Sequence, residues 1–256
     1  MINTWIITGD THGDMSRFNN WQAENDTAVI ILGDAGCNYY KNKKDTKTKM
    51  QLESVGCFFY LVRGNHEDRP ENVATMQSCY DENVDGEILF EQDFPHIRYF
   101  KDGGIYMLNG HRTLVIGGAY SVDKEYRLMM GYRWFPSEQL TTEEMQAITA
   151  NVEGQEFDLV LSHTCPIEWE PVDLFLSGID QSKVDKSMEL WLNDLREQIK
   201  WTVWLFGHYH QDRLERPGVE MYFHDMEDLE TVWHRWTSGK ELDWWLVKSP
   251  NYYKGV

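Results

Sequence analysis

Near the start of the chain, a short apolar run leads directly into a polar turn bounded by glycines, Trp5-Ile6-Ile7-Thr8-Gly9-Asp10-Thr11-His12-Gly13. The same arrangement recurs four times, and each apolar run has the length and composition of a buried strand. The five pairs of run and turn are Trp5–Thr8 with Gly9–Gly13, Ala28–Leu32 with Gly33–Asp34, Cys57–Val62 with Arg63–Glu67, Leu159–Leu161 with Ser162–Thr164, and Val203–Phe206 with Gly207–His210. Loops at the carboxyl ends of strands converge on one edge of an α/β sheet, so we expect these turns to meet in space.

The polar residues of these turns form a set of potential metal ligands. They comprise two aspartates, one asparagine and several histidines: Asp10, His12, Asp34, Asn65, His163, His208 and His210. Imidazole nitrogen combined with carboxylate and amide oxygen suits Mn²⁺, Fe or Zn²⁺ better than Ca²⁺, which prefers oxygen alone. The spacing Asp10-x-His12, like His208-x-His210, places both side chains on one side of an extended segment. The sequence therefore predicts a transition-metal site.

The blocks resemble, in their order, those of the calcineurin-like metallophosphoesterase superfamily. The matching blocks are Asp10-x-His12, Gly33-Asp34, Gly64-Asn65-His66-Glu67, a lone His163, and Gly207-His208-x-His210. The resemblance implies a four-layered α/β/β/α sandwich of two mixed β-sheets flanked by helices. It also implies two divalent metal ions, with Mn²⁺ first and Fe or Zn²⁺ as alternatives. The first ion would be held by Asp10, His12, Asp34 and His210, and the second by Asp34, Asn65, His163 and His208.

The activity implied by the resemblance is hydrolysis of a phosphomonoester or phosphodiester, with nucleotide-like esters among the candidates. Two metals about 3.5–4 Å apart clamp a phosphoryl group and lower the pKa of a bridging water, so that hydroxide attacks. His66 resembles the family's general acid or transition-state stabiliser at the leaving oxygen, a role that histidine can fill near neutral pH.

Two other functions are compatible with the sequence. Arg63 and Glu67 look like the Ser/Thr protein phosphatase branch, but Ala35-Gly36-Cys37 after Asp34 lacks that branch's Arg and the Asp partner of its histidine. The pair His208 and His210 is instead the pattern of the phosphodiesterase and nuclease-type branches. The second alternative is a non-catalytic, metal-stabilised scaffold that binds a partner. The presence of every matching ligand and of His66 argues against it.

Candidate substrate contacts lie outside the five turns, apart from Arg63. We expect the lysine-rich segment Lys41–Lys49 to be a solvated loop, with the alternative that it reaches the site and attracts phosphate through Lys43, Lys44 and Lys47. Tyr39 and Tyr40 could stack on a base. Arg127 and Arg133 are further candidates for contact with phosphate. His96, His111, His224 and His234 belong to no block, and we expect them to be ordinary imidazoles.

The composition limits the partners of the protein. The chain has 42 Asp and Glu against 24 Lys and Arg, a formal net charge of −18. We therefore expect neither long duplex nucleic acid nor a membrane as a partner, and attraction of a phosphate ester must be local. The four cysteines contain no CxxC pair, and no run approaches the ~18 apolar residues of a membrane span. Without a recognisable signal peptide, a soluble cytoplasmic protein with reduced thiols is expected.

Helical patterns and one hairpin complete the predicted organisation. A capping box at Thr141 predicts a helix over Thr142–Val152, and apolar spacing predicts another over about Lys186–Lys200. Asn109-Gly110 predicts a tight hairpin turn. We predict a catalytic domain over residues 1–230. The tryptophan-rich extension, 231–256, would pack on that domain or on a partner subunit of a homo-oligomer.

Overall fold

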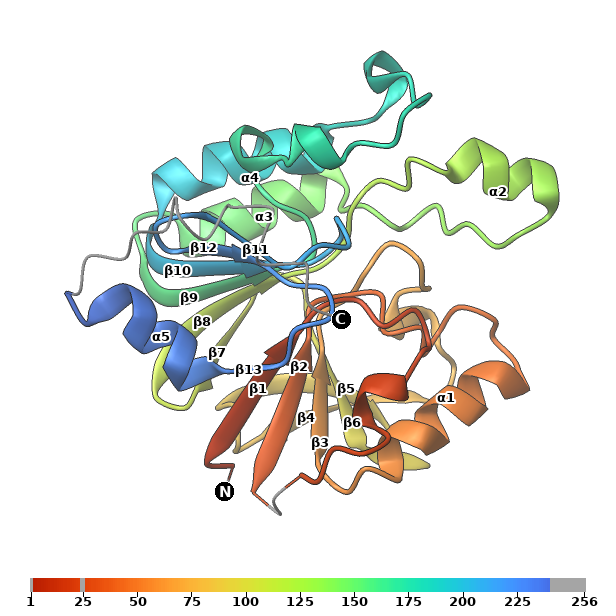
Figure 1. Ribbon diagram of the computed structural model, residues 1–256, viewed down its shortest axis with the longest axis vertical. Helices are drawn as coiled ribbons and strands as arrows, with labels where there is room; N and C mark the ends of the chain where they lie inside the picture. Colours follow the sequence, from red (N-terminus) through yellow and green to blue (C-terminus); the bar gives the residue numbers. More distant parts are fainter. Residues whose placement is uncertain (1, 24–25, 240–256) are drawn as a thin grey trace.

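Two β-sheets face each other at the centre of the computed structural model, which describes residues 2–23 and 26–239 (Figure 1). Within these residues, the larger sheet has seven strands and the smaller has six. The larger sheet has the order β13 (Glu227–Asp228), β1 (Thr4–Thr8), β2 (Thr27–Ile31), β3 (Phe58–Leu61), β6 (Phe94–Phe100), β5 (Gly86–Glu91) and β4 (Met76–Asp81). The smaller has the order β11 (Arg213–Arg216), β12 (Val219–Met221), β10 (Lys200–Phe206), β9 (Glu156–Ser162), β8 (His111–Ile116) and β7 (Gly104–Leu108).

Parallel strands form the middle of each sheet. β1, β2, β3 and β6 are successive parallel neighbours, as are β8, β9, β10 and β12. Antiparallel strands complete the edges, so both sheets are mixed. All of the expected apolar runs are strands, and Asn109-Gly110 forms the expected turn with positive φ angles of 51° and 85°. The carboxyl ends of the central strands therefore lie together, as the site prediction requires.

Alternating side chains bury both faces of each sheet. In β2, Ile30 packs between the two sheets, whereas Ile31 packs on the opposite face. In β10, Leu205 belongs to the core between the sheets and Trp204 to the core under the outer helices. Strands buried on both faces have continuous apolar sequences, because neither set of alternating side chains reaches water.

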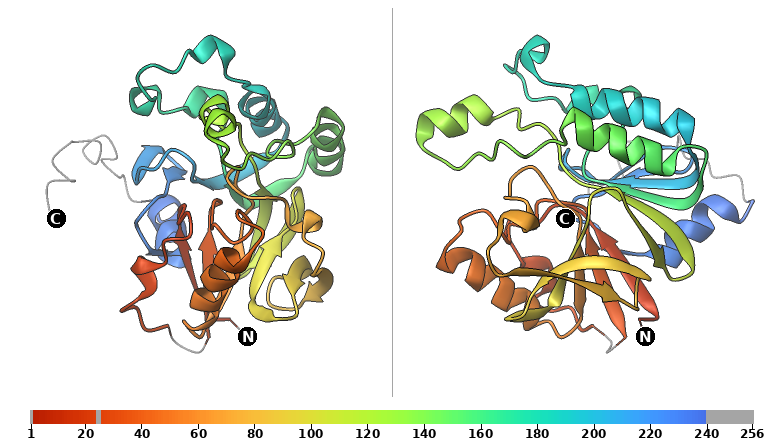
Figure 2. Two further views of the ribbon diagram at one scale, coloured as in Figure 1. Left: turned by 90° about the vertical axis from the view of Figure 1, so that its right-hand side faces the viewer. Right: turned by 180° about the vertical axis from the view of Figure 1, so that it is seen from behind.

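Helices cover the outer faces and produce four layers (Figure 2). α3 (Thr142–Val152) and α4 (Ser187–Gln198) cover the six-stranded sheet, and α1 (Lys43–Glu53) packs on the seven-stranded sheet against β6. α3 begins at the predicted capping box, in which Thr141 and Glu144 each accept a hydrogen bond from the other's backbone N–H. α5 (Leu229–Thr237) contacts β1 and β10 of the two sheets. The expected four-layered α/β/β/α sandwich is confirmed.

The prediction of a solvated loop over Lys41–Lys49 is wrong, because most of this segment forms α1. Asn42 caps the helix by accepting a hydrogen bond from the Lys44 backbone N–H. Lys49 is buried and forms an ion pair with Glu91 of β5. Among the buried residues of α1 only Leu52 is apolar, so the helix lacks the apolar periodicity by which sequence reasoning finds helices.

The predicted extension, 231–256, is described as far as residue 239. Trp233 and Trp236 of α5 pack against the core between the sheets, close to the buried Val232. Trp244 and Trp245 lie outside the described residues. The division at residue 230 and the homo-oligomer stay predictions. In the described part of the chain, no helix combines the length and apolar content needed to cross a membrane.

Two segments project from the same side of the sandwich (Figures 1 and 2). One connects β8 to α3 and carries the short helix α2 (Lys124–Met130). The other connects β9 to α4 and carries the 3₁₀ turns η3 (Ile167–Trp169), η4 (Val172–Leu174) and η5 (Gln181–Lys183). Two further 3₁₀ turns, η1 (Ser16–Phe18) and η2 (Pro70–Asn72), follow β1 and β3. Both projecting segments leave the carboxyl ends of their strands, and so they begin beside the converging turns.

Candidate metal centre

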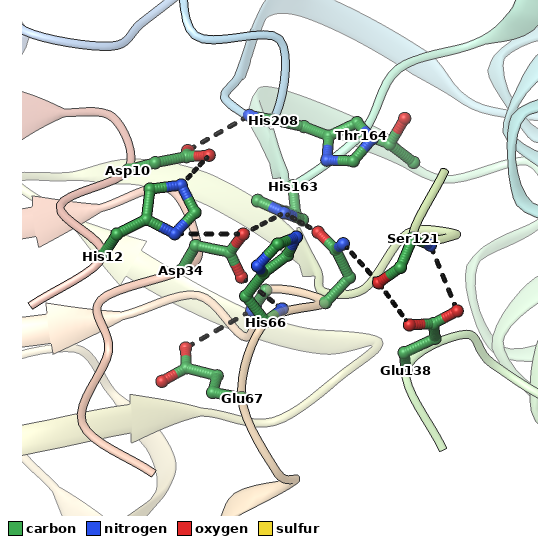
Figure 3. A network of polar contacts seen from close by, with 12 residues as sticks. Asp10, His12, Asp34, His66, Glu67, Ser121, Glu138, His163, Thr164 and His208 are labelled. Carbon is green, nitrogen blue, oxygen red and sulfur yellow. Dashed lines mark hydrogen bonds and ion pairs between the residues drawn. The ribbon is translucent and has the colours of Figure 1, made fainter. Parts of the chain in front are cut away.

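The five polar turns that follow β1, β2, β3, β9 and β10 meet at one place (Figure 3). Hydrogen bonds and close polar contacts among the side chains and backbone groups of these turns connect them into one network. Potential metal-ligating residues form three groups, and within each group the ligand atoms lie within 4.8 Å of one another. The groups are Asp10, His12 and His210; His12, Asp34 and His66; and Asp10, Asp34 and His163. Residues from opposite ends of the sequence are thus brought together, as expected for turns at the carboxyl ends of neighbouring strands.

Asp10 and Asp34 are the buried carboxylates at the centre of the network. In each, one oxygen accepts a hydrogen bond from the backbone of another turn. The N–H of His208 donates to Asp10 Oδ1 at 3.1 Å, and the N–H of His66 donates to Asp34 Oδ1 at 2.7 Å. Asp34 Oδ2 lies 3.9 Å from His12 Nδ1 and 3.6 Å from His163 Nε2. The backbone bonds therefore fix both carboxylates with their second oxygens facing the histidines.

Asp10 Oδ2 is a buried oxygen without a hydrogen-bond partner. It lies 3.4 Å from His210 Nε2 and 3.8 Å from His12 Nε2, and the two nitrogens are 2.8 Å apart. Leaving a carboxylate oxygen buried and unpaired is costly, whereas a cation between these inward-facing atoms would satisfy it. Carboxylate and imidazole donors suit divalent transition metals. The residues present therefore fit such an ion.

His163 and Asn65 form the other half of the centre. His163 Nδ1 donates to the carbonyl oxygen of Leu32 at 2.8 Å, and His163 Nε2 lies 2.8 Å from Asn65 Oδ1. Burial alone would lower the pKa of His163, but the carboxylates of Asp34 and Asp10 raise this pKa to about 9. A negative potential that favours a proton at this nitrogen also favours a metal cation.

His208 packs edge-on against His163, with ring centroids 5.0 Å apart. Burial, reinforced by the charge on His163, lowers the pKa of His208 to about 3. The imidazole of His208 is therefore neutral over the ordinary pH range. A neutral imidazole has the free lone pair that metal coordination requires.

Four of the predicted ligands adopt the left-handed backbone region. The φ angles are 48° at His12, 48° at Asp34, 70° at His208 and 55° at His210. Residues other than glycine rarely adopt this region, and such strain persists where the surrounding structure enforces it, commonly at functional sites. Among the described residues, the other non-glycine residues with positive φ are Lys41, Asp85 and Asn109. Backbone strain is thus concentrated at the proposed ligands.

A buried hydrogen-bonded chain holds Asn65 from behind. Asn65 Nδ2 donates to Ser121 Oγ at 2.9 Å, and Ser121 Oγ donates to Glu138 Oε2 at 2.5 Å. Buried Arg127 also donates to Ser121 Oγ, at 3.1 Å. These contacts turn the amide nitrogen away from His163 and leave the amide oxygen facing it. Ser121 lies 56 positions from Asn65, so no local motif could identify this contact.

His66 lies beside the metal-ligand residues, with its ring centroid 5.2 Å from that of His12. His66 Nε2 is 3.8 Å from Asp123 Oδ1. Asp123 therefore places a carboxylate next to His66. The segment Ala35-Gly36-Cys37, which follows Asp34, contains no carboxylate that could do so. Burial lowers the pKa of His66 and outweighs the opposite effect of the nearby Asp34 carboxylate. Asp123 could not be identified as a site residue from the sequence, because its contact with His66 joins distant segments.

The family model described as calcineurin-like phosphoesterase matches residues 4–212, which include all five turns. The chain belongs to the calcineurin-like phosphoesterase family. It is therefore a metal-dependent phosphoester hydrolase. Among solved structures, the chain is similar to a phosphopantetheinyl hydrolase from Mycobacterium tuberculosis, with 14% sequence identity, coverage of 98% of each chain and a TM-score of 0.45. A comparison with curated proteins gave no match.

Within this calcineurin-like phosphoesterase, Arg63 is buried rather than open to substrate. Its guanidinium donates to the Asp102 carboxylate at 2.8 Å and to the carbonyl oxygens of Glu138 and Gly117 at 2.7 and 3.1 Å. Because these partners occupy the guanidinium, we correct the prediction that Arg63 contacts substrate. Arg127 is likewise buried and supports Ser121, so its place is behind Asn65.

The other predicted substrate contacts lie nearer the surface. Tyr39 and Tyr40 line a hollow of about 360 Å³ together with His12 and His66. Lys44 Nζ lies 4.3 Å from the centroid of the Tyr40 ring. Lys43, Lys44, Lys47 and Arg133 are exposed. Outside the centre, His96 Nδ1 lies 2.6 Å from a carboxylate oxygen of Glu53, and His111 Nε2 lies 2.7 Å from one of Glu230.

Proposed function

We propose that this chain hydrolyses a phosphomonoester or phosphodiester with two divalent cations, Mn²⁺ first and Fe or Zn²⁺ as alternatives. The proposed ligands are Asp10, His12, Asp34 and His210 for one ion, and Asp34, Asn65, His163 and His208 for the other. The observation that carries the proposal is the convergence of ligand atoms of Asp10, His12, Asp34, His163 and His210, among which Asp10 Oδ2 is a buried oxygen without a hydrogen-bond partner. When bound, two such cations polarise phosphoryl oxygens and supply a hydroxide nucleophile at neutral pH.

The chain's own residues orient the reacting groups. Asp34 belongs to both ligand sets, and the backbone N–H of His66 fixes its carboxylate. His66 itself gives a proton to the leaving oxygen, with Asp123 beside its Nε2. Burial lowers the pKa of His66, and the negative charge of a bound phosphate group raises it again, which favours the protonated form.

A small phosphate ester is favoured over a phosphoprotein substrate. The protein phosphatase alternative depended on Arg63 and Glu67, and both residues are buried. Neither can therefore meet a protein surface. The family match over residues 4–212 argues against the scaffold alternative, which would require metal for stability and not for turnover.

The test is to remove metal with a chelator, restore Mn²⁺, and measure hydrolysis of p-nitrophenyl phosphate and bis-p-nitrophenyl phosphate. We expect turnover of at least one ester to return with the metal. Recovery of thermal stability without turnover would support the scaffold instead. In a second arm, His66→Ala should keep its metal and lose about 10²–10⁴-fold in kcat on an ester with a poor leaving group. His96→Ala is the matched control, and full activity of His66→Ala would refute the acid role.

A further inference from the structure

A cavity of about 290 Å³ begins at the proposed metal centre and continues between the two projecting segments. Its inner end is formed by Asp34, Asn65, His66, His208 and His210. A phosphoryl group held at the centre therefore has this cavity beside it. A group attached to that phosphoryl would enter the cavity.

The outer wall of the cavity is largely apolar. Side chains from both projecting segments contribute to this wall: Tyr120, Val122, Leu174, Phe175, Ile179 and Val184. Each of them is half-buried, so part of its surface faces the cavity and not the core. Apolar walls with a few polar groups at one end are typical of sites that bind small organic molecules.

The charged groups of the cavity disfavour a second anion. Lys186 Nζ lies 2.6 Å from Glu170 Oε1 and 4.8 Å from the centroid of the Phe175 ring, so its charge is already paired. Lys186 is the one lysine among the described lining residues, which include no arginine. Asp123 adds a carboxylate to the same walls. A second phosphate would find carboxylates here and no free cation.

We infer that this cavity binds the organic part of the substrate, and that the substrate is an ester of a single phosphate with an uncharged, largely apolar group. The inference rests on the proposed function, because it takes the phosphoryl group to be bound at the metal centre. A nucleoside diphosphate or a nucleic acid strand would bring a further anion toward the carboxylates.

The test compares n-alkyl phosphates from ethyl to hexyl in the presence of Mn²⁺, and alkyl p-nitrophenyl phosphates over the same lengths. The leaving group stays nearly constant in each series, so kcat/KM reports how the alkyl chain is bound. We expect kcat/KM to rise with chain length, up to about fourfold for each buried methylene. Hexylphosphonate, which is not hydrolysed, should inhibit more tightly than ethylphosphonate.

Cavity variants show where the chain binds. Phe175→Ala and Ile179→Ala should flatten the dependence on chain length, so that kcat/KM falls more for the hexyl ester than for the ethyl ester. Leu190→Ala, at an exposed position of α4 outside the lining, is the matched control and should keep the dependence.

The possible outcomes separate this inference from the proposed function. A flat or falling wild-type profile, a preference for nucleoside diphosphates, or an unchanged profile in Phe175→Ala and Ile179→Ala would overturn the inference while hydrolysis itself persists. Absence of hydrolysis of every ester, including p-nitrophenyl phosphate, would refute the proposed function and the inference with it.

Discussion

Replacing Gly64 by alanine should disable the metal centre without unfolding the protein. Gly64 lies directly against Asp34, the residue assigned to both ligand sets. A Cβ at position 64 would overlap Asp34 Oδ1 and the Asp34 backbone nitrogen, and would lie 2.6 Å from Asp34 Cγ. Because the backbone nitrogen is among the atoms overlapped, rotation of the Asp34 side chain cannot relieve the clash.

The size of the effect follows from the displacement. Ordinary contact begins at 3.4 Å, and the Asp34 backbone nitrogen would lie 2.2 Å from the new Cβ, so this nitrogen must recede by 1.2 Å, the difference between the two distances. A misplacement of about 1 Å near reacting groups can cost about 10²-fold in rate. We therefore expect Gly64→Ala to lose about 100-fold in kcat/KM, together with weaker binding of Mn²⁺.

The assay combines p-nitrophenyl phosphate turnover with Mn²⁺ titration and thermal unfolding. Gly56→Ala is the control, because a Cβ there meets no atom within 4 Å but the positive φ of 83° is strained. That control should lose about 1 kcal/mol of stability and keep its activity. Wild-type metal affinity and turnover in Gly64→Ala would refute the reasoning.

Three further substitutions test other parts of the structure. Ser121→Ala removes the acceptor for the Asn65 amide nitrogen and should weaken Mn²⁺ binding or activity about 10–100-fold; equal affinity by calorimetric titration would contradict this role. Burial raises the pKa of Glu189 to about 7, so the folded protein keeps a proton that the unfolded chain releases near pH 4.5, and stability falls as pH rises between these values. Glu189→Gln should remove this loss of stability, on the order of 3 kcal/mol. Denaturant unfolding of the wild type and the variant at about pH 4.5 and 8 measures it, and a variant with the same pH dependence as the wild type would contradict the prediction. Arg17 donates to the carbonyl oxygens of Asp10 and Phe223, so Arg17→Ala should lower the unfolding free energy by about 2 kcal/mol; a loss below 0.5 kcal/mol would count against that role.

The strands and the converging turns could be predicted because their signals are local. An apolar run such as Ala28–Leu32 needs both faces covered, and a polar turn at its end identifies the sheet edge where ligands gather. The capping box of α3 is contained within four residues and was likewise predictable. α1 was missed because it is held by a pair between Lys49 and Glu91, which are 42 positions apart.

The groups that surround the proposed ligands could not be found by the same reasoning. Ser121 and Asp123 reach Asn65 and His66 only after the segment between β8 and α3 has folded beside them. Arg63 has the residue type expected of a phosphate contact, yet non-local carbonyl groups surround it. Sequence spacing identifies residues that share a turn, whereas burial and partners depend on the whole fold.

The most direct test of the central claim is the metal stoichiometry of the purified chain. We expect apo-protein titrated with Mn²⁺ to bind two ions per chain, with magnetic coupling between them detectable by electron paramagnetic resonance. Asp34→Asn should abolish the coupling, because Asp34 is the residue assigned to both ions. Binding of a single ion, or of two uncoupled ions, by a wild-type protein that hydrolyses phosphate esters would contradict the dinuclear centre.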